Sequence, residues 1–166
     1  MRSLAAIGCG SNLESTFGDR EANLQEAIRL IRPLGAVRAV SSFYDTEPVG
    51  LLAQPRFLNG ALLLETNLEP LALLREVLAV ERAMGRDRVG AVAKGPRVID
   101  LDLLFYIGSD GRQLVMNSEE LVLPHPEMQA RRFVLEPLAE IAPGMVHPVF
   151  GQSVQEMLEQ VKRGAE

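Results

Sequence analysis

The sequence is poor in cysteine and in positive charge. Its 166 residues include a single cysteine, Cys9, which excludes an internal disulfide framework and fits a reducing cytosol. Asp and Glu outnumber Lys and Arg by 22 to 17, which gives a formal net charge of −5. This balance argues against a nucleic-acid-binding protein held by bulk electrostatics.

Long apolar runs are also missing. No stretch approaches the roughly 20 apolar residues of a transmembrane helix. The first apolar run is interrupted by Gly8 and is too short for the core of a signal peptide. We therefore expect a cytoplasmic protein that has no membrane partner.

Several familiar catalytic motifs are absent from the sequence. The Gly8-Cys9-Gly10 stretch, which we interpret as part of a turn over residues 8–12, lacks the Gly-Lys-Ser/Thr of a phosphate-binding loop. There is no Gly-x-Ser-x-Gly nucleophile motif and no Cys/His spacing typical of a metal site. Any phosphate chemistry must then rest on Mg²⁺, aspartates and arginines.

The remaining composition is that of an ordinary globular protein. Hydrophobic residues make up 47% of the chain and charged residues 23%. A chain of this length has room for one domain with a proper core and is too short for two comfortable ones. We expect a single domain over residues 1–166.

The most informative stretch is GPRVIDLDLLF, residues 95–105, which has the β-branched and apolar content of a strand. Alternation places Asp100 and Asp102 on one face, with Cα atoms roughly 7 Å apart. At an effective dielectric constant of about 20 the two carboxylates repel by roughly 2 kcal/mol. Mg²⁺ would offset this repulsion; the alternative is that both side chains face solvent. The same alternation assigns the opposite face to Arg97, Ile99, Leu101, Leu103 and Phe105.

Periodicity and turn signals predict the order β-α-β-β-α-β. Strands are expected at residues 4–7, 37–44, 57–65 and within 95–105. One helix follows an N-cap at Asp19, and the next runs from Pro70 to Gly85 with Leu71, Leu74, Val77 and Leu78 as its buried stripe. The order is typical of a ferredoxin-like α+β fold, with both helices on one face of an antiparallel sheet and the aspartates on the other. A C-terminal hairpin near residues 109–111 and helices at 131–141 and 154–162 complete the prediction.

Other side chains suit phosphate or ring binding, each with a plain structural alternative. Arginine forks bind phosphate oxygens, although surface arginines are commonplace. A histidine between two prolines has a fixed backbone, as a ligand contact requires, but a lone histidine is often structural. Two phenylalanines could stack on a planar ring or simply pack in the core. These residues are Arg86, Arg88, Arg97, His125, Arg131, Phe57 and Phe133.

A set of motifs in one order resembles the hydroxymethyl-dihydropterin pyrophosphokinase family of folate biosynthesis. The resemblance runs from the first strand to about Pro148. The motifs are Gly10–Leu13, Ser41–Tyr44 with Thr46, Pro48 and Gly50, Gln54-Pro55 with Phe57-Leu58-Asn59, Glu81 with Gly85-Arg86, Gly95–Leu103, and Pro124-His125 with Arg131 and Phe133.

The resemblance implies a ferredoxin-like enzyme that transfers pyrophosphate from ATP to 6-hydroxymethyl-7,8-dihydropterin and releases AMP. It implies that Asp100 and Asp102 hold two Mg²⁺ ions and act in catalysis with Arg97 and Arg86. ATP would contact Glu81, Arg88, Arg97, Leu103, His125 and Arg131. The pterin would contact Thr46, Pro48, Val49, Phe57, Asn59, Lys94, Asp100 and Phe133. Lys94 departs from the tryptophan that some members carry there.

Partners are therefore expected to be small molecules, with no nucleic acid, and the chain is expected to be a monomer. Two alternatives stay open at this point. One is a non-catalytic ferredoxin-like domain that senses nucleotides, and the other is a pyrophosphokinase for a different planar alcohol. The first is disfavoured because sensing needs no paired aspartates beside arginines.

Overall fold

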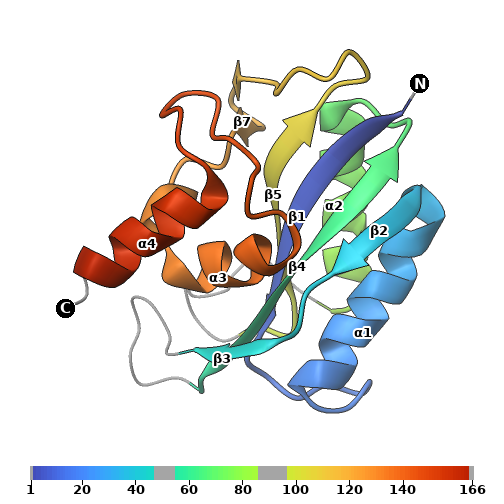
Figure 1. The fold of residues 1–166 in the computed structure, drawn as a ribbon. Helices are drawn as coiled ribbons and strands as arrows, with labels where there is room; N and C mark the ends of the chain where they lie inside the picture. The colour runs from blue at the N-terminus through green and yellow to red at the C-terminus, as the bar shows by residue number, and fades with distance from the viewer. Residues whose placement is uncertain (1, 47–54, 86–96, 165–166) are drawn as a thin grey trace.

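A central antiparallel sheet with helices on both faces organises the chain (Figure 1). The computed structural model describes residues 2–46, 55–85 and 97–164. The sheet has the strand order β2-β4-β1-β5, and β3 pairs with β4 beyond the end of β2. Its strands are β1 Ser3–Ser11, β2 Ala36–Val40, β3 Tyr44–Thr46, β4 Phe57–Thr66 and β5 Asp100–Ile107. This topology confirms the predicted ferredoxin-like α+β fold.

Helices α1 (Arg20–Ile31) and α2 (Pro70–Ala83) pack on one face of the sheet. The Asp19 carboxylate caps α1 as predicted, because it accepts a hydrogen bond of 2.9 Å from the Ala22 N–H. Val77 is buried as predicted, but the rest of the α2 stripe differs from the prediction. Leu73 and Val80 are buried, whereas the other three predicted residues, Leu71, Leu74 and Leu78, are only half-buried. Apolar residues surround this helix too widely for spacing alone to choose its inner face.

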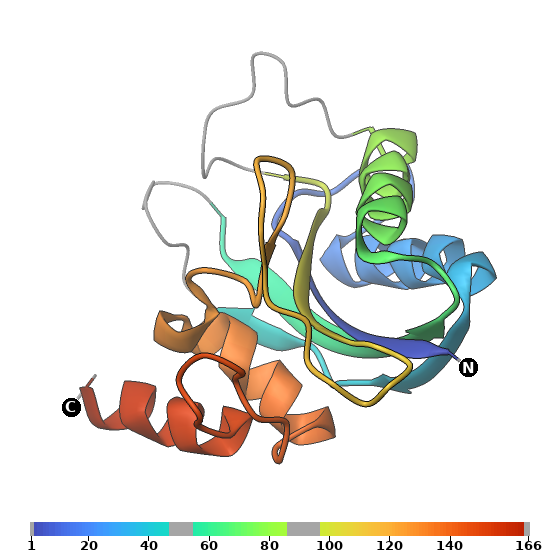
Figure 2. The same ribbon diagram turned by 90° about the horizontal axis from the view of Figure 1, so that it is seen from above.

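The opposite face carries a second core under the two predicted C-terminal helices, whose position the sequence did not indicate (Figure 2). Helices α3 (Arg132–Ile141) and α4 (Val154–Gly164) pack there, after the short 3₁₀ turn η2 (Met128–Ala130). A capping box lies at the start of α4. The Ser153 hydroxyl accepts from the Glu156 N–H at 3.1 Å, and the Glu156 carboxylate accepts from the Ser153 N–H at 3.0 Å.

Three strand predictions need correction. The residues 8–12 interpreted as a turn lie largely in β1, since Gly8 and Gly10 pair with β4 and β5. The single strand predicted at residues 37–44 is broken into β2 and β3, and at the break the Ser41 hydroxyl accepts from the Ala61 N–H at 2.9 Å. The hairpin near residue 110 has its turn, but beyond an isolated bridge at Gln113 the short strands are β6 Met116–Asn117 and β7 Val122–Leu123.

A bulge in β5 changes which side chains share a face. The register with β1 passes from Ala6–Phe105 to Ile7–Leu103, so Leu104 has no partner across the ladder. Leu101 and Leu103 therefore face α1 and α2, while Phe105 packs in the second core. The predicted common face for Leu103 and Phe105 is wrong, because strict alternation cannot foresee a bulge.

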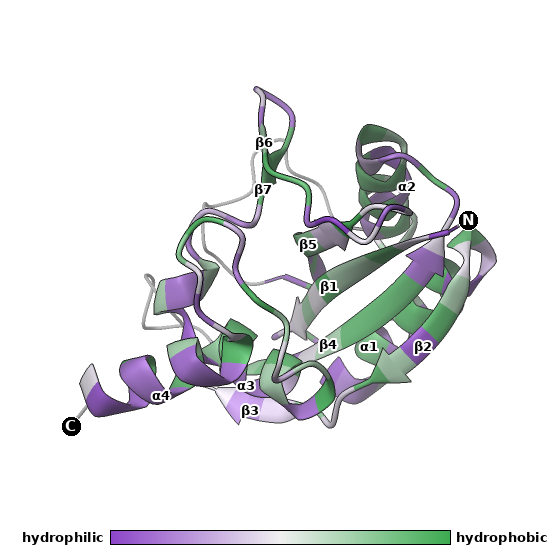
Figure 3. Ribbon diagram, turned by 45° about the horizontal axis from the view of Figure 1, so that its top comes forward, coloured by the Kyte–Doolittle hydropathy of each residue, from purple (hydrophilic) through white to green (hydrophobic). Residues whose placement is uncertain are grey.

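Hydropathy follows this arrangement. The central strands β1 and β4 are largely hydrophobic, whereas β3 at the margin is not (Figure 3). The 3₁₀ turn η1 (Arg32–Leu34) links α1 to β2 at the other margin of the sheet. Among helices of the described residues, none combines the length and apolar content needed to cross a bilayer.

Candidate active site

Two glycines of β1 form the floor of the candidate site. Gly10 lies between Asn59 of β4 and Asp100 of β5, and Gly8 lies between Ala61 and Asp102. Directly opposite residues of neighbouring strands point to the same face, so no side chain rises from β1 between Asn59 and the aspartates. A Cβ at Gly10 would lie 2.6 Å from the Asn59 Oδ1, so a side chain there would displace the amide that binds Thr46.

Asp100 and Asp102 form one side of this floor, which we call the acidic wall. They lie on the face opposite α1 and α2, as predicted, and their side chains are 25% and 39% exposed. Arg97 Nη1 lies 3.3 Å from Asp100 Oδ2, and His125 Nε2 lies 3.9 Å from Asp102 Oδ1. The structure therefore brings together four of the predicted site residues around a partly buried pair of carboxylates.

His125 is fixed by its backbone and by one ring nitrogen. Its N–H donates to the Leu104 carbonyl at 3.0 Å, and its Nδ1 accepts from the Glu127 N–H at 3.3 Å. Burial lowers the pKa of His125 below its ordinary 6.5, and the positive charge of Arg131 lowers it further against the opposing effect of Asp100. The imidazole is thus neutral at pH 7 and carries its proton on Nε2, the atom that faces Asp102.

Glu81 supports the acidic wall from behind. It is buried on α2, at 1% exposure, and its Oε2 accepts from the Leu101 N–H at 2.8 Å. Leu101 separates the two aspartates, so this bond fixes the strand between them. The predicted ATP contact of Glu81 stays a prediction, as does that of Leu103, whose side chain lies in the core against α1 and α2.

The other side of the floor is the polar-aromatic wall, defined by Thr46, Phe57 and Asn59. Asn59 Nδ2 donates to the Thr46 hydroxyl at 2.6 Å, and Thr46 pairs with Phe57 across the β3–β4 ladder. Phe57 also borders the floor, since its Cδ1 would lie 3.6 Å from a Cβ at Gly10. Three predicted substrate-binding residues therefore lie together.

Phe133 faces a cavity of about 420 Å³ that Thr46 and Arg131 also line. Its ring is half-buried, packs against the second core, and has the Arg131 guanidinium 5.6 Å from its centroid. Arg131 also pairs with Glu127. Phe133 therefore contacts the core and also faces the cavity, so its position is compatible with both the packing role and the stacking role that the sequence left open.

Asn12 was not assigned a role in the sequence analysis, although its motif was recognised. It is 2% exposed; its Oδ1 accepts from the Arg97 N–H at 2.6 Å and its Nδ2 donates to the Pro55 carbonyl at 3.0 Å. Its own N–H donates to the Arg97 carbonyl at 3.0 Å. One buried amide therefore joins the segments that precede β4 and β5, a link between distant positions that no local pattern reveals.

Five predicted site residues, Pro48, Val49, Arg86, Arg88 and Lys94, lie outside the described residues. Within the described part of the chain, no group of three or more His, Cys, Asp or Glu side chains is placed to hold a metal ion. A cation at the acidic wall would then draw its remaining ligands from water and a bound phosphate. That donor set fits Mg²⁺, which is usually held by one or two carboxylates together with substrate phosphates.

Comparison with known proteins gives a consistent result. Residues 6–143 match the family described as 7,8-dihydro-6-hydroxymethylpterin-pyrophosphokinase (HPPK). The chain is 42% identical to the 2-amino-4-hydroxy-6-hydroxymethyldihydropteridine pyrophosphokinase of Bacillus subtilis, over 85% of this chain and 79% of that protein. The protein of the same name from Methylorubrum extorquens is also 42% identical, with 93% of this chain and 90% of that protein covered.

Longer proteins match as well. The chain is 38% identical to the folic acid synthesis protein fol1 of Schizosaccharomyces pombe over 95% of its own length, but it spans only 20% of that protein. A crystal structure of HPPK-DHPS in complex with substrates superposes with a TM-score of 0.75 at 15% identity, over 100% of this chain and 44% of that one. At that identity the likeness supports the fold alone.

Proposed function

The chain belongs to the 7,8-dihydro-6-hydroxymethylpterin-pyrophosphokinase family, and from that premise we propose its reaction. The protein transfers the β,γ-pyrophosphoryl group of ATP to the hydroxymethyl group of 6-hydroxymethyl-7,8-dihydropterin and releases AMP. The observation that carries the proposal is the glycine floor, which opens a space between a phosphate-binding acidic wall and a ring-binding polar-aromatic wall.

The chemistry needs positioning and charge neutralisation more than proton transfer. The hydroxymethyl oxygen attacks the β-phosphorus and forms the new P–O bond. The bond between that phosphorus and the oxygen bridging to the α-phosphate breaks, and AMP leaves with the electron pair. The hydroxyl proton passes to solvent, so the absence of an obvious general base is consistent with the proposal.

Asp100 and Asp102 would hold two Mg²⁺ ions on the ATP phosphates. When bound, the metal supplies charge neutralisation to the transferring group. Arg97, already beside Asp100, adds a guanidinium that binds phosphate oxygens through its planar fork. His125, neutral at pH 7, donates a hydrogen bond from its Nε2–H to a phosphate oxygen. Arg131 stands close enough to His125 to lower the pKa of its imidazole.

The polar-aromatic wall binds and orients the acceptor. Asn59 and Thr46 offer amide and hydroxyl groups to the polar edge of the pterin, while the half-buried Phe57 and Phe133 offer ring faces for stacking. Their side of the floor faces the acidic wall across Gly10. The acceptor hydroxyl is thereby directed toward the phosphates.

The deciding experiment follows nucleotide products with and without the pterin alcohol. We expect AMP to form from ATP only when both the pterin and Mg²⁺ are present, with one diphosphorylated pterin per AMP. Formation of ADP would contradict pyrophosphoryl transfer. ATP binding without turnover would favour a nucleotide-sensing domain, and turnover only with another planar alcohol would favour the second alternative.

We further propose that residues 1–166 act as one domain and as a monomer in the cytoplasm, without nucleic-acid or membrane partners. The net charge of −5 and the family match over residues 6–143 support this proposal. Light scattering coupled to size-exclusion chromatography tests it. A mass near twice the chain's 18.2 kDa would contradict the monomer.

A further inference from the structure

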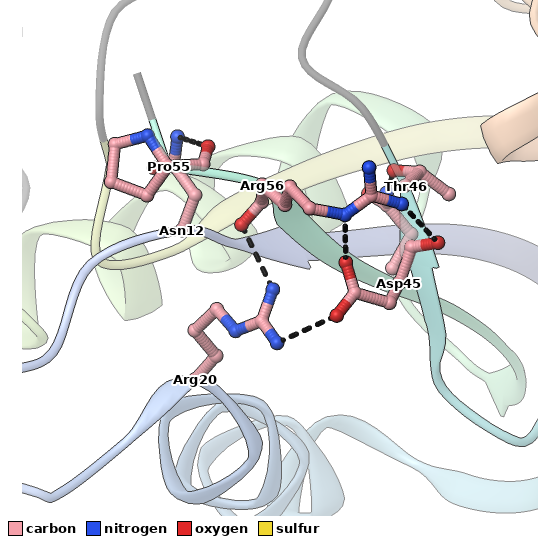
Figure 4. A network of polar contacts seen from close by, with 7 residues as sticks. Asn12, Arg20, Asp45, Thr46, Pro55 and Arg56 are labelled. Carbon is pink, nitrogen blue, oxygen red and sulfur yellow. Dashed lines mark hydrogen bonds and ion pairs between the residues drawn. The ribbon is translucent and has the colours of Figure 1, made fainter.

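One carboxylate joins three segments beside the polar-aromatic wall (Figure 4). Asp45 of β3 accepts from Arg56 Nε at 2.7 Å through Oδ1 and from Arg20 Nη2 at 3.0 Å through Oδ2. Arg20 Nη1 also donates to the Arg56 carbonyl at 2.9 Å. The first turn of α1, strand β3 and the residue before β4 are therefore linked by one group, which we call the Asp45 clamp: Arg20, Asp45 and Arg56.

The Asp45 clamp lies directly behind the polar-aromatic wall. Asp45 precedes Thr46 in the chain, and Arg56 precedes Phe57. Thr46 and Phe57 are paired across the ladder, and Asp45 pairs with Leu58 on the opposite face, toward α1. The clamp thus joins the residues next to Thr46 and Phe57 on the face of the sheet opposite the glycine floor.

Stability alone gives a weak reason for this arrangement. The side chains of Arg20, Asp45 and Arg56 are 30%, 49% and 50% exposed, and exposed ion pairs contribute little to the free energy of unfolding. Yet both oxygens of one carboxylate are used by guanidinium groups from separate segments. They border a cavity of about 680 Å³ that Asn12 and Pro55 also line, where Asn12 holds the Pro55 carbonyl.

We propose that the Asp45 clamp is a positioning device for the acceptor side of the active site. It sets the separation and tilt of Thr46 and Phe57, and thereby the affinity for the planar alcohol, without contacting either substrate. Asn12 links this clamp to the acidic wall, because it binds both the Pro55 carbonyl and the Arg97 backbone. The two walls are therefore held in a fixed position relative to one another. The proposal rests on the proposed function, because it assigns the acceptor to this wall.

The test compares Asp45→Asn, Arg56→Gln and the double variant with the unmodified chain. We expect the KM for the pterin alcohol to rise about tenfold in each single variant while the KM for ATP stays within about twofold. Because both changes release the same contact, the double variant should be no worse than Asp45→Asn alone. Midpoints of thermal unfolding should fall by only a few degrees, as for an exposed pair.

The chain offers a matched control near the end of β4 that is remote from Arg56 and Phe57. Glu65 of β4 pairs with Arg38 of β2, with side chains 30% and 58% exposed. Glu65→Gln removes a comparable inter-strand ion pair far from the glycine floor. It should leave both KM values unchanged.

A second readout does not depend on turnover. Amide hydrogen exchange along the β3–β4 ladder should become about threefold faster in Asp45→Asn, and not in Glu65→Gln. Faster exchange in a protein that makes no AMP would retain the clamp as a positioning device and refute the proposed function. Unchanged exchange together with an unchanged pterin KM, or equal rises in both KM values, would overturn the clamp itself.

Discussion

The two walls of the glycine floor differ in the charge of the side chains that form them. On β5, Asp100 and Asp102 stand on one face of one strand, and the side chains near them include Arg97 and a neutral His125. On β3 and β4, the Asn59 amide and the Thr46 hydroxyl bind one another at 2.6 Å. The acidic wall brings two carboxylates together on one strand, whereas the polar-aromatic wall joins a neutral amide to a neutral hydroxyl.

This difference separates function from stability. Removing a carboxylate from the acidic wall relieves repulsion and leaves the core intact, so activity should fall without loss of folding. Changes behind or within the polar-aromatic wall break contacts that the folded chain itself uses. The experiments below test that contrast, from the largest expected effect to the smallest.

The largest effect is expected from Asp100→Ala and Asp102→Ala. Each should lower kcat at least about a thousandfold, because in the proposed reaction the metal on the ATP phosphates would lose one of its two protein carboxylates. Neither should lower the midpoint of thermal unfolding, because each change removes one of two like charges on the same face of β5. Single-turnover kinetics and calorimetry measure the two quantities. Near-normal turnover at saturating Mg²⁺ in both variants would refute the role of the acidic wall.

Glu119→Ala is the control for these variants, because Glu119 is exposed on the segment between β6 and β7. It removes the same kind of charge away from the floor. Both its turnover and its unfolding midpoint should match those of the unmodified chain.

The next effect concerns Glu81, which supports the acidic wall from α2. Glu81→Ala removes the acceptor of the buried Leu101 N–H and should cost about 1–3 kcal/mol of unfolding free energy. Glu81→Gln keeps an amide oxygen at the same position and should retain most of that stability. Urea titration of both variants distinguishes them. Equal stability of Glu81→Ala and the unmodified chain would mean that the wall does not depend on this bond.

The same contrast explains what the sequence could reveal. The acidic wall was predictable because Asp100 and Asp102 are two residues apart on one strand. The sheet topology was predictable because each element of the β-α-β-β-α-β order can be recognised from its own local sequence pattern. The second core was not foreseen, because the α3–α4 pair packs on the sheet through contacts far apart in sequence. Asn12 and Asp45 were missed as positioning residues for the same reason: their partners lie 43 residues away at Pro55 and 25 away at Arg20.

Glycine gave the clearest misreading. The pattern around Gly8 and Gly10 predicts a turn, because glycine in a short polar stretch most often indicates one. Here they serve close approach within a strand, since a side chain at Gly10 would collide with Asn59. The signal for the site floor was therefore present, but its meaning required the two neighbouring strands.

A smaller effect is expected at Phe133, where α3 meets the polar-aromatic wall. Phe133→Ala should weaken pterin binding about tenfold through lost stacking and leave ATP affinity measured alone unchanged. Its half-buried ring should make the stability loss smaller than the roughly 3–5 kcal/mol of a fully buried phenylalanine. Thermal unfolding and pterin titration on one sample give both numbers. A loss in that higher range with unchanged pterin affinity would assign Phe133 to the core alone.

The smallest effect is expected where α3 attaches to the bend between β2 and β3. Glu140 accepts from the Tyr44 hydroxyl at 2.6 Å and from the Ser42 N–H at 2.9 Å. These bonds lower the pKa of Glu140 below its usual 4.5, and the bond to Glu140, with a lesser effect of burial, raises the pKa of Tyr44 from 10.0 to about 12. A lowered carboxyl pKa contributes stability above pH 4.5 that is lost as the pH falls through the folded value. A raised phenol pKa contributes stability below pH 10 that is lost as the pH rises toward 12.

Glu140→Gln should therefore unfold at a slightly lower temperature than the unmodified chain at pH 7, and this gap should close below pH 4.5. In the same variant the phenolate absorbance of Tyr44 should appear at lower pH, nearer its ordinary pKa of 10.0. Glu26→Gln, which removes the mostly buried partner of the exposed Arg29 on α1, should leave the titration of Tyr44 unchanged. Tyr44 pairs with Asn59 across the β3–β4 ladder, so its bond to Glu140 connects α3 to the polar-aromatic wall. A difference in unfolding temperature that persists at pH 3 would mean that packing, and not the ionised Glu140, holds α3 to this wall.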